Sequence, residues 1–343
     1  MQVDSVATAV GYPCQARLEG DEENVRWFGP AREPDRRALA SWCSAVGPVE
    51  FVPRPSRSYA PPESVAELTI VTWNVHVGGG DLPGFLKSEL GYDCDAGDGE
   101  SFQTHFVLLA QEAYRASNHV PEPPEGAHVP GRIAEHPPTG FRVDIVEMAK
   151  RCGLALFYVP SMRNGRESGE HGREDRGSAI LSTLPLSGPV AVELPLEAQR
   201  RVTVAATVPG PGGGASIRVA SVHLDVAGNI LRVLGTGGSM RVRQNDGLTE
   251  ALDMLDPDRV IPIVVAGDMN TWSERETVIL QMLRTYPDSP APGREKTRGD
   301  WPPDHLFFRA GNGPFALVEG SYRVVKDNYG SDHKARLATF ARR

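Results

Sequence analysis

The sequence feature that most limits the fold is a short apolar run at residues 261–266 that ends abruptly in polar residues. A short apolar run rich in Val and Ile is typical of a buried β-strand. It is followed by Gly267, Asp268 and Asn270. A rigid strand end fixes a carboxylate and a carboxamide in space, and glycine lets another backbone or a substrate phosphate come close. The alternative is that Asp268 and Asn270 cap a turn or the next helix, where both residue types are common.

The same arrangement recurs along the chain. Five predicted strand boundaries carry polar side chains, and the start of a further strand carries Asp304 and His305. In chain order, the five boundaries carry Asn74, Glu112, His223, Asp268 with Asn270, and Asp332 with His333. Taken singly, an Asn at a strand end is typical of a turn, and a lone His there of a structural contact. Because independent turns rarely produce such a series, the pattern favours one polar site at the rim of the strands.

The function of two features, Glu112 and a basic stretch, depends on which residues lie beside them. Glu112 follows an apolar strand, and a carboxylate buried there without a partner is costly, so a metal ion or a basic neighbour is expected. An ordinary surface acid is the alternative. The most basic stretch, residues 161–176, contains Arg163, Arg166, His171, Arg173 and Arg176. Such a run is usually solvated, but beside an active site it could hold a phosphate or steer an anionic substrate.

Composition and periodicity favour an α/β protein. The chain has 29 prolines and 36 glycines among 343 residues, which fits many irregular connections between strands better than a helical bundle. Helices are predicted at residues 37–46, 82–90, 143–152, 241–255 and 274–283. Strands are predicted at residues 68–76, 106–112, 155–159, 177–182, 201–208, 215–222, 261–266, 304–308, 315–321 and 335–340, those from 177 to 222 being antiparallel with a hairpin turn at 209–214.

The chain divides near residue 66. Residues 1–66 hold charged and proline-containing stretches without a catalytic constellation, and we interpret them as an N-terminal extension packed on a main domain at residues 67–343. No apolar run is long enough to span a membrane, and the first residues lack the features of a signal peptide. We therefore expect either a secreted or periplasmic protein whose export signal was removed, or a cytoplasmic one. The oligomeric state stays open.

Charge and cysteines limit the function further. The net charge of −8 argues against polyanion binding driven by counterion release. Four cysteines, Cys14, Cys43, Cys94 and Cys152, allow three pairings in an oxidising compartment. None is spaced as Cys-x-x-Cys, so a structural zinc site is not expected, and buried thiols and disulfides both remain open.

Together these motifs resemble those of the endonuclease/exonuclease/phosphatase superfamily, which includes DNase I-like nucleases, inositol phosphatases and bacterial sphingomyelinases. The matching segments are TWNV at 72–75, QE at 111–112, RGSAI at 176–180, SVHL at 221–224, GDMN at 267–270, DH at 304–305 and SDH at 331–333. The resemblance implies a four-layered α/β sandwich, in which two mostly antiparallel sheets pack face to face with helices outside. It extends over residues 68–340.

The resemblance also implies roles for the site residues. Asn74 and Glu112 would be the Mg²⁺ ligands, with Mn²⁺ an alternative ion and Asp332 near the ion directly or through water. Asp268 and Asn270 would orient or activate the attacking water. The side chains that would contact the substrate phosphate are Arg176, His223, Asn270 and His333, with Asp304 the carboxylate partner of His333 and His223 either stabilising charge or aiding the leaving group. The family's acidic residue after the Asn is replaced here by Val75 and His76, so a second metal is not expected.

The leading hypothesis is a Mg²⁺-dependent phosphodiesterase or phosphatase that uses in-line attack of an activated water. A DNase I-like endonuclease or exonuclease acting on nucleic acid is the first alternative. A catalytically inactive binding module on the same fold is the second.

Overall fold

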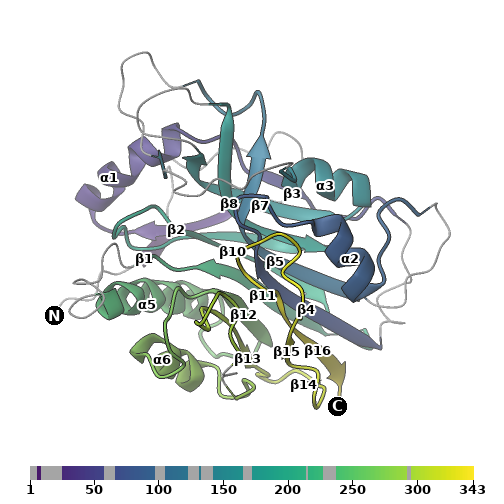
Figure 1. Ribbon diagram of the computed structural model, residues 1–343. Helices are drawn as coiled ribbons and strands as arrows, with labels where there is room; N and C mark the ends of the chain where they lie inside the picture. Colours follow the sequence, from purple (N-terminus) through teal and green to yellow (C-terminus); the bar gives the residue numbers. More distant parts are fainter. Residues whose placement is uncertain are drawn as a thin grey trace.

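The protein is described by a computed structural model that covers residues 25–57, 66–96, 105–122, 142–164, 172–213, 215–226, 237–291 and 295–343, with the backbone of two short strands at 6–8 and 131–132. Its strands form two sheets (Figure 1). The first sheet has the order β1 (Val6–Thr8), β2 (Arg26–Pro30), β9 (Ser187–Glu193), β10 (Val202–Pro209), β11 (Ser216–His223), β12 (Ile263–Asp268) and β13 (Asp304–Arg309).

The second sheet carries most of the remaining strands. Its order is β14 (Phe315–Leu317), β16 (Arg336–Arg342), β4 (Glu67–Asn74), β5 (His105–Ala116), β8 (Glu174–Ser182), β7 (Ala155–Asn164) and β3 (Glu50–Val52), with β15 (Arg323–Val324) beside β16 and β6 (Gly131–Arg132) beside β7. The helices are α1 (Glu33–Ser44), α2 (Leu82–Leu90), α3 (Ile145–Cys152), α5 (Gly237–Leu255) and α6 (Thr277–Thr285). Most strand pairs in both sheets are antiparallel.

Alternating side chains build four layers. Along β12, Val264 and Ala266 belong to the core between the sheets, while Ile263 and Val265 pack with α5 and α6 on the outer face. The other sheet is built in the same way, with α2 and α3 on its outer face. Figure 1 shows these helix pairs on opposite sides of the two sheets. The predicted four-layered α/β sandwich is confirmed.

Glycine is required where β11 and β12 run side by side. A Cβ atom on Gly267 would lie 1.8 Å from the carbonyl oxygen of Val222, its partner in register. No real Cβ comes that close, so a side chain at this position forces the two strands apart. Gly267 therefore sets the spacing of the strands that end at His223 and Asp268.

The predicted helices all occur, and α2 has the predicted bounds. Its ends are defined by local chemistry: the Asp81 side chain accepts a hydrogen bond from the Gly84 amide, and Gly91 adopts the left-handed conformation at the C-terminus. The sequence reading missed β9, which lies between β2 and β10 in the first sheet. It also ended the strand at 106–112 too early, since β5 continues to Ala116.

Residues 26–52 add strands to both sheets. β2 pairs with β9 in the first sheet, and β3 pairs with β7 in the second. Trp27 and Leu39 are buried in the core between the sheets. The division of the chain at residue 66 stays a prediction, but this segment contributes directly to the main hydrophobic core.

A disulfide joins Cys94, after α2, to Cys152 at the end of α3. It links two segments separated by 58 residues on the outer face of the second sheet. Within the described parts of the chain, none of the helices combines the length and apolar content needed to cross a membrane.

Candidate active site

Four strands bring polar side chains to one edge of the sandwich. β11 and β12 are parallel, so His223 and Asp268 are partners in register at their last residues. β13 runs antiparallel to β12 and begins at Asp304, which lies opposite Asp268. From the other sheet, Asn74 at the end of β4 donates a 3.0 Å hydrogen bond to Asp268 Oδ2. The structure brings these four predicted residues together, while their catalytic roles stay predictions.

Asp268 is the buried centre of this arrangement. Its Oδ1 accepts a 2.8 Å hydrogen bond from the backbone N–H of Asn270, which has a positive φ of 51°. The Asn270 side chain in turn donates to the Leu224 carbonyl. Burial raises the pKa of Asp268 from 3.8 to about 6, against the opposing effects of protonated His333 and of the Asn74 hydrogen bond. At neutral pH this carboxylate is ionised and close to the pH at which it takes up a proton.

His333 and Asp304 form a buried ion pair beside Asp268. His333 Nδ1 lies 2.8 Å from Asp304 Oδ2, and its Nε2 lies 3.8 Å from Asp268 Oδ2. Burial lowers the pKa of His333, but the charges of Asp304 and then Asp268 outweigh it and raise the value from 6.5 to about 9. Although burial alone would raise the pKa of Asp304, the positive charge of His333 lowers it. His333 is therefore an imidazolium at neutral pH, as the predicted phosphate contact requires.

His305, the second residue of the predicted Asp-His motif, does not join the site. Its Nε2 lies 3.0 Å from Thr271 Oγ1, and burial lowers its pKa to about 3. It is a neutral structural histidine.

His223 lies near the same carboxylate oxygen of Asp268 as His333 does. Its Nε2 is 3.5 Å from Asp268 Oδ2, and its Nδ1 is 3.0 Å from the guanidinium of Arg201. Sequence reasoning missed Arg201. The register of the β10–β11 hairpin, continued beyond Val204 opposite Ser221, places Val202 opposite His223 and Arg201 opposite Leu224, so the pairing pattern alone gives no signal for the contact.

Glu112 does not follow the end of its strand, contrary to the prediction. β5 runs on to Ala116, and its pairing with β8 shifts between Ala110 and Ala113, so Glu112 lies in a β-bulge. Its positive φ of 52° is strained for a residue with a side chain, and such conformations often occur at functional sites. Its Oε2 lies 3.7 Å from Nη1 of the buried Arg176, which fits the expected basic neighbour.

The basic stretch at residues 161–176, predicted as a loop, is strand in most of its described part. Arg163 lies in β7, buried, and donates to the carbonyl oxygens of Ala45, Pro121 and Gly172. Arg173 pairs with Glu122 at the surface. Residues 165–171, with Arg166 and His171, lie outside the described residues. The glycines in the run suggested a loop, but its two ends continue long strands of the sheet.

Asp332 lies at the rim of the site, with 30% of its side chain exposed. Its Oδ2 lies 2.6 Å from Arg298, and its Oδ1 lies 3.7 Å from His76 Nδ1 and 3.9 Å from His333 Nε2. After β4, His76, Val77 and Gly78 all have positive φ, an uncommon run that directs the chain past Asp332. Asp332 thus has three basic neighbours within 4 Å.

Two sets of residues could hold a metal ion. Among the described side chains, Asp268, Asp304 and His333 are the one group of acids and imidazoles whose ligand atoms all lie within 4.8 Å of one another. A ligating imidazole must be unprotonated, and the pair with Asp304 keeps His333 charged, so this set does not suit a cation. Glu112 and Asn74 suit a hard cation better, because they offer a carboxylate and an amide oxygen and Asn74 is the register partner of Gln111.

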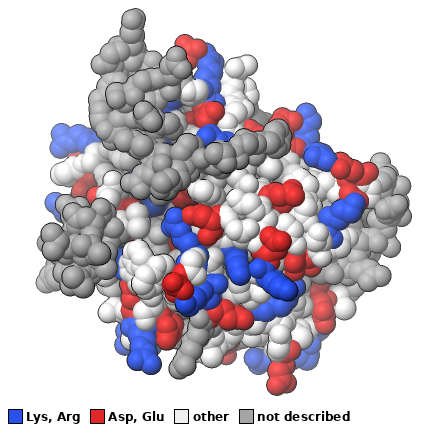
Figure 2. Space-filling view, in the orientation of Figure 1, with Lys and Arg blue, Asp and Glu red and all other residues white. Residues whose placement is uncertain are grey.

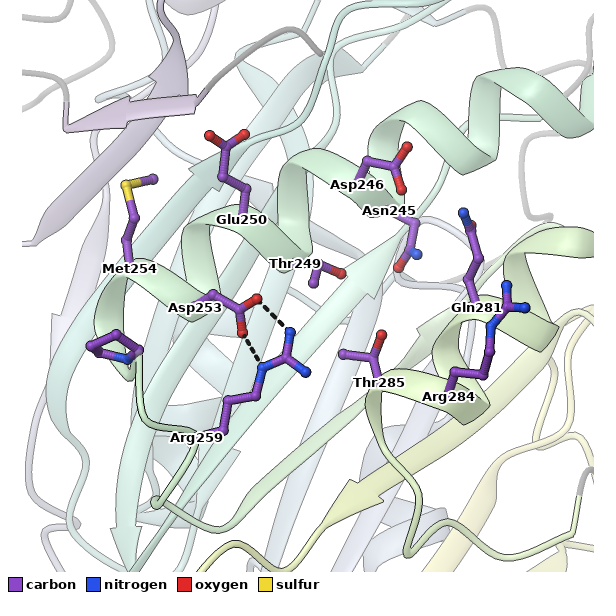
Figure 3. A pocket seen from close by; sticks show the side chains of 11 residues that line it. Asn245, Asp246, Thr249, Glu250, Asp253, Met254, Arg259, Gln281, Arg284 and Thr285 are labelled. Carbon is purple, nitrogen blue, oxygen red and sulfur yellow. Dashed lines mark hydrogen bonds and ion pairs between the residues drawn. The ribbon is translucent and has the colours of Figure 1, made fainter.

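A groove elsewhere on the surface has none of these residues. It has a volume of about 740 Å³ and lies between α5 and α6 (Figure 3). Its walls include Thr249, Glu250 and Gln281, with the ion pair of Asp253 and Arg259 at one end. Arg259 precedes the first residue of β12 and Asp268 is the last, so the groove reaches toward the opposite end of that strand.

Comparisons with known proteins agree with this architecture. An endonuclease/exonuclease/phosphatase from Beutenbergia cavernae DSM 12333 is similar with a TM-score of 0.52 and 18% identity, over 81% of this chain and 72% of that chain. The human Nocturnin catalytic domain is similar with a TM-score of 0.54 and 16% identity, over 84% of this chain and 100% of that chain. No curated protein sequence matches significantly. These structural likenesses establish the fold.

The family itself is established from the sequence. A family model described as Endonuclease/Exonuclease/phosphatase family matches residues 71–333, which is more than half of the 343 residues and includes every predicted site residue. The chain belongs to the Endonuclease/Exonuclease/phosphatase family.

Proposed function

We propose that the protein is a divalent-metal-dependent hydrolase that cleaves a phosphoester by in-line attack of a water molecule. Membership of the family supports phosphoester hydrolysis in general. The observation that carries the more specific proposal is the pairing of a buried carboxylate, Asp268, with a buried imidazolium, His333, at one strand edge. A base and a cation side by side are what attack on a phosphate requires.

In this proposal Asp268 accepts the proton of the attacking water. Its pKa of about 6 is well matched to neutral pH, where the carboxylate is ionised yet basic enough to take up a proton. The Asn270 amide and the Asn74 side chain hold its two oxygens in place. His333, oriented by Asp304, donates to the phosphate oxygens and offsets the charge that develops on them. Arg176 and Asn270 complete the phosphate-binding set.

Glu112 and Asn74 would hold the metal, with Asp332 near it directly or through water. Mg²⁺ is our first choice and Mn²⁺ our second, because all three side chains offer oxygen ligands. When bound, the ion supplies Lewis-acid stabilisation of the phosphoryl oxygens. Arg176 beside Glu112 offsets part of the negative charge of the ligand set when the ion is absent.

A nuclease is the second candidate, favoured by one observation. Trp272, two residues after Asn270, and Trp301, three residues before Asp304, are 37% and 47% exposed. Their rings meet edge to face with centroids 5.0 Å apart. Exposed aromatic rings next to a phosphoester site suit stacking on a nucleobase. Against this, on the one face drawn in Figure 2 the described acidic and basic side chains are interspersed rather than grouped as a basic track.

The deciding experiment is a substrate panel assayed with Mg²⁺, with Mn²⁺ and with EDTA. Plasmid DNA, RNA, sphingomyelin, inositol phosphates and a generic phosphodiester would be compared for the wild type and Asp268→Asn. We expect EDTA to abolish turnover and Asp268→Asn to reduce kcat by about 10²-fold or more. Asp258→Asn, an exposed acid before β12, is the matched control. Full activity in Asp268→Asn would refute the mechanism, and no Mg²⁺ binding by calorimetry would revive the inactive binding module.

We also propose that the protein works in an oxidising compartment, outside the cytoplasm. The disulfide between Cys94 and Cys152 supports this, because such bonds are rare in reducing compartments. Alkylation of the native-source protein before and after reduction, followed by mass spectrometry, tests it. Labelling of both cysteines without reduction would contradict the proposal.

A further inference from the structure

The side chain next to His223 constrains its chemistry. Arg201 lies just before β10, and its Nη1 is 3.0 Å from His223 Nδ1. Both residues are buried, and Asp225 Oδ1 lies 3.5 Å from Arg201 Nε. Asp225 is itself fixed, since its Oδ2 accepts the backbone N–H groups of Ala198 and Gln199. The guanidinium is therefore held between a carboxylate and an imidazole.

A guanidinium can only donate hydrogen bonds. It has five N–H donors and no acceptor, and it stays protonated in proteins. In the contact with Arg201, His223 Nδ1 must therefore be the acceptor, and it has no proton of its own. A neutral imidazole with an unprotonated Nδ1 has its proton on Nε2. A doubly protonated His223 would instead point an N–H at a cation.

The other charged neighbours agree with this tautomer. Nε2 of His223 is 3.5 Å from Asp268 Oδ2, so the N–H is directed toward a carboxylate oxygen. His333 Nε2 lies 3.8 Å from the same oxygen and supplies the positive charge on that side. Among the described contacts, His223 thus has Arg201 next to Nδ1 and Asp268 next to Nε2. Asp225 lies beside Arg201, and His333 lies beside Asp268.

We infer that Arg201 is a positioning residue that keeps His223 neutral, with its single proton on Nε2 and directed into the site. A neutral imidazole can donate this hydrogen bond but cannot give up the proton. His223 therefore stabilises charge on a phosphate oxygen and does not protonate the leaving group, which decides between the two roles that the sequence left open. The inference about catalysis rests on the proposed function, but the tautomer itself does not.

The tautomer can be measured in the resting protein. Long-range ¹H–¹⁵N correlation spectra of protein labelled at histidine nitrogens distinguish the two neutral tautomers and the imidazolium, and loss of one signal set in His223→Gln assigns the residue. We expect the wild type to show the Nε2–H form from pH 5.5 to 8. A proton on Nδ1, in either the neutral or the charged form, would overturn the inference whether or not the protein hydrolyses any substrate.

Arg201→Gln tests the cause. An amide can turn its oxygen toward Nδ1 and accept a hydrogen bond there, so we expect His223 to bind a second proton as the pH is lowered to 5.5. Arg309→Gln is the matched control, because it removes a buried partner of Asp256 at the far end of β13. It should leave the His223 spectrum unchanged. An unprotonated Nδ1 in folded Arg201→Gln at pH 5.5 would show that Arg201 does not set the tautomer; if that variant does not fold, the wild-type spectrum still decides the tautomer.

Substitutions of His223 connect the tautomer to turnover. Gln places an N–H donor near the position of Nε2, whereas Asn places one near Nδ1. We expect His223→Gln to retain at least tenfold more kcat than His223→Asn on whichever substrate of the panel is cleaved. Equal losses in the two variants would contradict a role for Nε2–H as a hydrogen-bond donor.

Discussion

Two buried ionic clusters in this protein are built differently. In the first, Arg115 donates from Nε and Nη2 to Asp175 and from Nη1 to the Pro48 carbonyl, while Asp175 also accepts from Tyr158 and the Gly47 amide. In the second, Asp268 has two imidazoles 3.5 Å and 3.8 Å away, beyond normal hydrogen-bond length.

The difference indicates which cluster is structural and which is open to a ligand. In the cluster of Arg115 and Asp175, the donors and acceptors satisfy one another. In the cluster of Asp268 and His333, Asp304 Oδ1 is buried without a hydrogen-bond partner among the described residues, and both imidazoles lie 3.5 Å or more from Asp268 Oδ2. Buried polar groups are normally satisfied, so an exception calls for an explanation. Under the proposed function, bound substrate would supply further partners to this cluster.

The largest effect on stability is expected from breaking the cluster of Arg115 and Asp175. Arg115→Met leaves Asp175 buried without its cation and should lower the free energy of unfolding by about 3–5 kcal/mol. Urea denaturation measures the loss. Arg142→Met, which removes a partly exposed pair with Glu174, is the control and should cost about 1 kcal/mol or less. Turnover per folded molecule should survive in both. A strong loss of kcat in folded Arg115→Met would remove the distinction between the clusters.

The cluster of Asp268 and His333 should lose turnover in addition to stability. Asp304→Asn removes the nearest charge on His333 and should reduce the kcat of the folded protein by about 10²-fold, while it also removes the stability that this ion pair contributes. Because Asp304 is the largest influence that raises the pKa of His333, the alkaline limb of the pH–rate profile should move to lower pH. An alkaline limb that stays in place would show that His333 is not the group that titrates there.

The pH profile of the wild type tests the cluster of Asp268 and His333 without a substitution. Activity requires ionised Asp268 and protonated His333, so kcat/KM should fall about tenfold per pH unit below about 6 and above about 9. Stability should follow His333 as well. Its pKa is higher in the folded state than its usual 6.5, so its contribution is complete below pH 6.5 and is lost as the pH rises through about 9. Urea denaturation of the wild type and His333→Gln at pH 6 and 9.5 measures this; equal losses of stability in both would exclude His333 as the cause.

The smallest effect is expected at the rim. If the substrate carries a nucleobase, Trp301→Ala should raise KM about fivefold, which corresponds to about 1 kcal/mol and is the low end of the range for stacking on one base. The free energy of unfolding should change by no more than about 0.5 kcal/mol. Leu280→Ala, an exposed residue on α6, is the control. An unchanged KM on oligonucleotides would favour a substrate without a base and weaken the nuclease alternative.

Much of the site was predictable because its residues lie at the ends of apolar runs. Asn74, His223 and Asp268 each end a strand, and strand ends can be read from local patterns. The bulge at Glu112 was not predictable, because the apolar run gives no sign of a shift in pairing with β8. Arg115 and Asp175 were missed for a related reason: they are 60 residues apart in the chain, and only the pairing of β5 with β8 makes them neighbours.

The closeness of Gly267 to Val222 has a consequence for how this site could be tuned. Because even one methyl group at position 267 has no room, Gly267→Ala would separate β11 from β12 without changing any polar atom of the site. A purely steric change at position 267 would thus alter the distance between the His223 imidazole and the Asp268 carboxylate. The geometry of this edge depends on the absence of a side chain at position 267 as well as on its charged groups.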